Sequence, residues 1–121
     1  MVQTDIPQTA AECADWRQTL RKYRDEFSHD KKELEQLCRT ALSKDQLQQV
    51  EHFSNQFHIQ LINIHDLKQT IKAHEHDLQS SSAPSDELLA QHEELYEKFA
   101  AIEAMLQELR NEFSNFRSTV S

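Results

Sequence analysis

The sequence has no glycine and only two prolines, Pro7 and Pro84. Tight β-hairpins and β-bulges depend on glycine, or on Asn-Gly and Asp-Gly pairs, because these residues reach positive φ. Glu, Gln, Leu, Lys, Arg and Ala dominate instead, and they are strong helix formers. The sequence therefore predicts an all-α protein, and its 121 residues fit a single helical domain over 1–121.

Long apolar runs are also missing. No run approaches the ~18 residues of a membrane span, and the first residues lack the basic and apolar regions of a signal peptide. The two cysteines, Cys13 and Cys38, fall in one predicted helix about 37 Å apart at ~1.5 Å per residue, so they cannot pair with each other. Free thiols fit a reducing compartment. We expect a cytoplasmic protein with no membrane partner.

The formal net charge is −8, and residues 80–121 carry eight acidic and three basic side chains. Nucleic-acid binding needs a basic stripe that displaces counterions from phosphates. The candidate stripe consists of Arg17, Arg21, Lys22 and Arg24. Acidic residues are interspersed with it, at positions 15, 25 and 26. We therefore expect no nucleic-acid partner.

Three segments repeat large apolar residues at alternating steps of three and four, which is the heptad pattern of packed helices. We expect helices at about 9–42, 44–79 and 85–119, the first two opening with capping boxes at Thr9 and Ser43 and the third following a Ser-rich loop, 80–85. The predicted fold is an antiparallel up-down-up three-helix bundle with coiled-coil-like heptad packing. One continuous helix over 9–79 is the alternative.

Polar residues interrupt the heptad seams at Asp30, Gln60, His74 and His92. Asp30 has two interpretations, both structural. It is either a buried polar residue, paired with His58, or the N-cap of a kinked helix, since Asp30-Lys31-Lys32-Glu33 has the capping-box pattern.

The layout of three long heptad helices resembles a spectrin-type repeat. The features that carry the resemblance are Trp16 early in the first helix and the stretches 65–68 and 74–78, reading His-Asp-Leu-Lys and His-Glu-His-Asp-Leu, in the second. The resemblance implies a three-helix architecture, and no function is carried over from it.

The middle of the second helix is apolar all round, because Phe57, Ile59, Leu61, Ile62 and Ile64 surround its axis. A helix of this kind tends to be buried all round. We therefore predict that Phe57, Ile59 and Ile62 belong to an interface, most simply a homodimer contact. The competing explanation is that two exposed isoleucines are ordinary on a protein surface.

Five of the seven histidines lie on the second helix, but their spacing does not match helical metal motifs. Cys13, His74 and His92 could nevertheless converge near one bundle end, and they are a reasonable zinc set. Chance clustering in a His-rich chain is the competing explanation. We expect no cofactor, and metal binding is kept as the alternative function.

Catalytic chemistry has little support in the sequence. Neither cysteine has an evident activating partner, and no glycine is present to build a phosphate loop. We expect a non-enzymatic structural or interaction module, without a small-molecule substrate, that binds itself or another helical protein through its helical faces. A third possibility is an acidic helical chaperone or mimic for a basic partner, which would use Glu93, Glu94 and Glu97.

Overall fold

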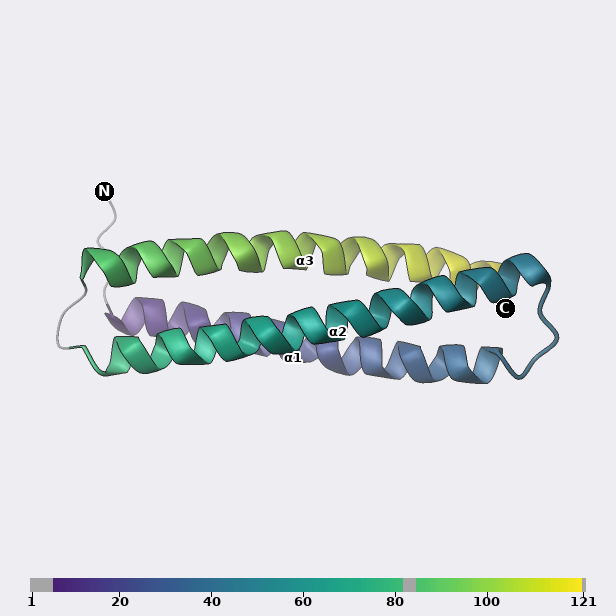
Figure 1. Cartoon of the computed structure of the whole chain (residues 1–121), viewed down its shortest axis with the longest axis horizontal. Coiled ribbons are helices and arrows are strands. Elements are labelled where there is room, and N and C mark those ends of the chain that lie inside the picture. The colour runs from purple at the N-terminus through teal and green to yellow at the C-terminus, as the bar shows by residue number, and fades with distance from the viewer. Residues whose placement is uncertain (1–5, 82–84, 121) are drawn as a thin grey trace.

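The computed structural model describes residues 6–81 and 85–120, which form a bundle of three helices (Figure 1). Helix α1 spans Ile6–Leu37, α2 spans Lys44–Gln79 and α3 spans Asp86–Val120. In Figure 1, α2 runs back beside α1, and α3 again runs in the direction of α1. The prediction of an all-α three-helix bundle is confirmed, and no strand occurs in the described ranges.

Helix α1 differs from its predicted bounds at both ends. It begins at Ile6, so Thr9 lies inside the first turns as a buried residue and is not the N-cap. Helix α1 ends at Leu37 because the chain tightens there, with the amides of Arg39 and Thr40 donating to the carbonyls of Gln36 and Leu37. This turn separates α1 from α2 and excludes a continuous helix over 9–79.

The start of α2 follows the predicted capping box. The Gln46 amide donates to Ser43 Oγ at 3.1 Å, and the Ser43 amide donates to Gln46 Oε1 at 2.9 Å. Ser85 caps α3 in a similar way, since its Oγ accepts from the Leu88 amide at 3.1 Å. Part of the predicted loop, residues 82–84, lies outside the described residues.

The core follows the three heptad seams and is richest in aromatic rings midway along the bundle and towards the α1–α2 turn. Phe57 is fully buried there, with ring centroids 5.0 Å from both Phe27 and Phe113. Phe53 packs beside it, 5.2 Å from Phe116. The polar seam residues Asp30, Gln60, His74 and His92 are also buried.

Ion pairs join the helices along the edges of the core. Arg17 of α1 makes a bidentate pair with Glu75 of α2. Two pairs one heptad apart join α1 to α3, Glu26–Arg110 at 2.9 Å and Glu33–Arg117 at 3.1 Å. The two arginines also stack over core rings, Arg110 over Tyr23 and Arg117 over Phe113. These contacts fix the position of α1 along the bundle axis relative to α2 and α3.

Helix α1 passes through Asp30 without a break, so the interpretation of Asp30 as an N-cap is wrong. Its side chain is buried, as the other interpretation requires, but His58 is exposed on α2. His58 follows the buried seam residue Phe57 and so points outward. Within the described residues, no helix has a stretch that is both long and apolar enough to cross a bilayer.

Candidate functional site

Two features of the bundle are candidates for function: the outer face of α2 and a buried polar cluster at one end. On the outer face, Ile59 is 46 % exposed and Ile62 is 48 % exposed, and they lie one helical turn apart. Phe57 does not belong to this surface, because it occupies a seam position and its side chain is fully buried. The predicted three-residue interface therefore reduces to two isoleucines on α2.

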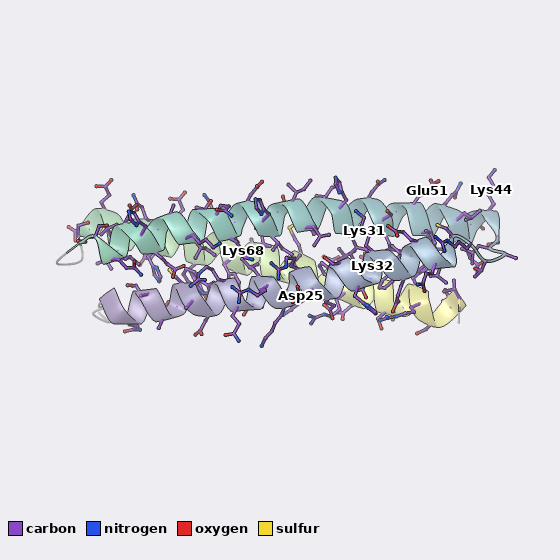
Figure 2. The ribbon with its side chains drawn as sticks, turned by 90° about the horizontal axis from the view of Figure 1, so that it is seen from below. Asp25, Lys31, Lys32, Lys44, Glu51 and Lys68 are labelled. Carbon is purple, nitrogen blue, oxygen red and sulfur yellow. The ribbon has the colours of Figure 1, made fainter. Side chains whose placement is uncertain are left out.

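The segment around these isoleucines carries no formal charge. Residues 52–65 include no Asp, Glu, Lys or Arg, in a chain in which these four types make up 28 % of residues. Figure 2 shows charged side chains of α2 on either side of this segment. Lys44 and Glu51 lie before the segment, and Lys68 lies after it. Sequence reasoning missed this uncharged segment, although it can be counted directly from the residues.

A third exposed apolar residue lies at the same level of the bundle. Met105 of α3 is 49 % exposed and lines a shallow hollow of about 280 Å³ together with Gln56 and Gln60 of α2. Ile59 is the sequence neighbour of Gln60. Glu108 and Glu112 of α3 also line this hollow, so the uncharged surface is limited to α2 and Met105 lies at its border. We call Ile59, Ile62 and Met105 the outer apolar patch.

At one end of the bundle, near the start of α1, the polar cluster takes one side chain from each helix. Cys13 comes from α1, His74 from α2 and His92 from α3. Each occupies a seam position, so the packing that buries the apolar seams also drives these three side chains inward. They are 0 %, 4 % and 6 % exposed, and their donor atoms all lie within 4.8 Å of one another. The predicted convergence of the three residues is present in the structure.

The ring of His92 is at the centre of the cluster. Its Nδ1 lies 3.2 Å from His74 Nε2 and 3.9 Å from Cys13 Sγ. Its Nε2 lies on the other side, 3.3 Å from Glu12 Oε2. Trp16 stacks on the same ring at a centroid distance of 4.8 Å. The imidazole is therefore fixed in orientation, with one nitrogen towards the cluster and the other towards a carboxylate.

Burial controls the protonation of the cluster. It raises the pKa of the Cys13 thiol to about 12, with the carboxylates of Glu75 and Glu12 adding to the increase and Arg17 opposing it. Burial also lowers the pKa of His74, and neighbouring His92 lowers it further. A thiol with a raised pKa is a poor nucleophile, so the cluster does not resemble a catalytic Cys–His pair.

The donor set is one that a transition metal takes. Thiolate sulfur and imidazole nitrogen are typical ligands of zinc, whereas magnesium and calcium prefer oxygen. The other four histidines of α2 are exposed and do not join the cluster: His52, His58, His65 and His76.

The comparisons with known proteins give no match: no family model, curated protein or solved structure matches this chain. Function must therefore be inferred from the described residues themselves.

Sequence reasoning missed the role of Glu12 beside His92. A signal for it exists, because Glu12, Glu26 and Glu33 are separated by multiples of seven and so lie on one edge of α1. Glu26 and Glu33 pair with arginines of α3, whereas Glu12 faces His92 of α3. This edge of α1 therefore meets α3 along most of its length.

Proposed function

We propose that this chain is a non-enzymatic helical interaction module that associates with a second copy through the outer apolar patch. The observation that carries the proposal is the uncharged segment 52–65, which exposes Ile59 and Ile62. The centres of protein interfaces are depleted of charged residues and enriched in large apolar ones. The exposed side of this segment, with Ile59 and Ile62, is better suited to contact with protein than to contact with water.

If a second copy binds, this face is the one that electrostatics opposes least. Two copies that each carry a net charge of −8 repel one another, so a stable contact must keep their carboxylates apart. The uncharged segment lets the copies approach about a two-fold axis without placing acidic groups opposite each other. The acidic positions Glu93, Glu94 and Glu97 of α3 would make a poor contact between identical chains, because like charges would meet.

Association can be tested by the molar mass of the protein in solution at micromolar concentrations. We expect the wild-type chain to behave as a dimer. The double variant Ile59→Glu/Ile62→Glu should weaken association by on the order of 100-fold, because two carboxylates per copy would be desolvated at the contact.

Leu47→Glu provides a matched control, because Leu47 is 41 % exposed on the same helix but lies outside the patch. This variant should remain dimeric. A wild-type mass equal to one chain across the micromolar range, or a double variant that dimerises as strongly as the wild type, would exclude the proposal.

A further inference from the structure

We propose that Cys13, His74 and His92 bind one divalent transition-metal ion of the zinc class, which links all three helices at one end of the bundle. This inference is independent of the proposed self-association, because the cluster lies in the core near the start of α1, whereas the outer apolar patch lies on the surface in the middle of α2.

The spacing of the donor atoms is close to what zinc requires. In a tetrahedral site with bonds of roughly 2.0–2.3 Å, neighbouring ligand atoms lie about 3.3–3.6 Å apart. His74 Nε2 and His92 Nδ1 are 3.2 Å apart, and Cys13 Sγ is 3.9 Å from His92 Nδ1. Since all three donor atoms lie within 4.8 Å of one another, side-chain shifts of about 1 Å complete the geometry.

Without an ion, each placement of the His74 ring proton leaves one unfavourable contact in this conformation. If His74 carries its proton on Nε2, it can donate to His92, but its buried Nδ1 is then a lone pair with no hydrogen-bond partner. If the proton is on Nδ1, the amide oxygen of Gln91 is the neighbouring acceptor, but the lone pairs of His74 Nε2 and His92 Nδ1 then face each other across 3.2 Å. Leaving a buried polar atom unsatisfied is costly.

A metal ion resolves this conflict. It accepts the lone pairs of His74 Nε2 and His92 Nδ1 together, so the two nitrogens no longer oppose each other. The proton of His74 then lies on Nδ1, near the α2–α3 groove, where Gln91 and His74 line one hollow of about 200 Å³. The amide oxygen of Gln91 is suited to accept that hydrogen bond.

Glu12 supplies the outer partner that metal-binding histidines usually have. Its Oε2 lies 3.3 Å from His92 Nε2, so the ring N–H can donate to the carboxylate while Nδ1 faces the cluster. A carboxylate in this position fixes the tautomer and makes the opposite nitrogen a stronger ligand. Glu12 is therefore a positioning residue, and the ring of Trp16 stacked on His92 holds the same orientation.

The charge and proton balance of binding is simple. The ion displaces the thiol proton of Cys13 to solvent, a sulfur–metal bond forms, and no oxidation occurs. Three protein ligands leave the fourth position of a tetrahedral ion to a water molecule. Because each ligand comes from a different helix, the bound ion favours the folded state, and its binding free energy adds to the stability of the bundle.

The experiment uses the full chain without a His tag, freed of metal by chelation, and titrated with Zn²⁺ or Co²⁺. Free Zn²⁺ at 100 times its Kd should raise Tm by about 10 °C. Co²⁺ should bind in a ratio of one per chain with a thiolate-to-metal charge-transfer band. Cys13→Ser and His74→Gln should lose the Tm increase, and Cys13→Ser should also lose the band.

The chain offers matched controls for both ligand types, because Cys38 and His76 are exposed and lie outside the cluster. Cys38→Ser and His76→Gln should bind as the wild type does. Glu12→Gln leaves the three ligands and the core unchanged, and should weaken Zn²⁺ binding by roughly 10–100-fold. It therefore provides a second test if a core variant fails to fold.

Three results would overturn the proposal. The first is a Tm increase of equal size in wild type and in folded Cys13→Ser. The second is Co²⁺ binding by the wild type without a thiolate band. The third is loss of binding in His76→Gln or Cys38→Ser, since the metal would then be held at the surface.

Discussion

Asp30 is the one acidic side chain in the core of the described part of the bundle, and it should make stability depend on pH. Burial raises its pKa from 3.8 to about 6; Arg117 opposes this shift, and Glu26 and Glu33 add to it. The folded state therefore holds the proton more tightly than the unfolded chain does. Asp30 consequently costs no stability below about pH 4, and its cost grows as pH rises from about 4 to 6.

Replacing Asp30 with Asn removes this titration while keeping the size of the side chain. The free energy of unfolding of Asp30→Asn, relative to that of wild type, should increase by about 1–3 kcal/mol as pH rises from 4 to 7. Urea unfolding at several pH values measures the difference. Asp25→Asn, at an exposed site on the same helix, is the control. An Asp30→Asn difference that does not change with pH would contradict the prediction.

At the scale of single residues, the heptad seams predict which residues are buried, but they do not predict which side chains those residues pair with. The heptad positions of Cys13, His74 and His92 are enough to bring the three residues together, because helix register fixes which residues share a layer. The link between His92 and Glu12 depends on a side-chain rotamer at the edge of the seam, which periodicity does not determine. The pairing of Asp30 with His58, one of its two interpretations, does not form for a different reason: His58 follows the seam residue Phe57 and is exposed.

At the scale of helices, the Ser43 capping box defines the start of α2. It satisfies two amides that the first turn would otherwise leave unpaired. Ser43→Ala should therefore lower the free energy of unfolding by about 1 kcal/mol. Thermal or urea unfolding measures the loss. Ser114→Ala, in the exposed interior of α3, should be neutral or slightly stabilising because alanine is the better helix former.

The bounds of α2 and α3 could be read from the sequence to within a residue, because the Ser43 capping box precedes α2 and the Ser-rich loop with Pro84 lies between the two. The end of α1 could not be read from the sequence. No Gly or Pro marks Leu37, and the residues that follow are compatible with a helix. The chain turns there because α2 must pack back on α1, with Leu42 partly buried against the core. The end of α1 is therefore determined by tertiary packing, which the helix propensities of the local residues do not encode.

At the scale of the whole molecule, the two ends of the bundle differ in core chemistry. Interlocking phenylalanines such as Phe53 and Phe57 fill one half, whereas the other end contains the polar cluster around His74 with a buried ring nitrogen unsatisfied. The cluster end has three polar side chains in its core layer where the other half has phenylalanine rings. We therefore expect the backbone amides of residues 71–75 to exchange hydrogen faster than those of 53–57, although both segments belong to α2.

The same hydrogen-exchange measurement separates the two proposals, because they act on different parts of α2. Zn²⁺ should slow exchange around 71–75 and leave 59–62 unchanged. Raising the protein concentration should slow exchange around 59–62 and leave 71–75 unchanged. If Zn²⁺ slowed exchange equally along all of α2 in the Cys13→Ser variant as well, the ion would act at some other site and the cluster would have no part in the effect. If concentration had no effect at 59–62, the outer apolar patch would be only solvent-exposed surface.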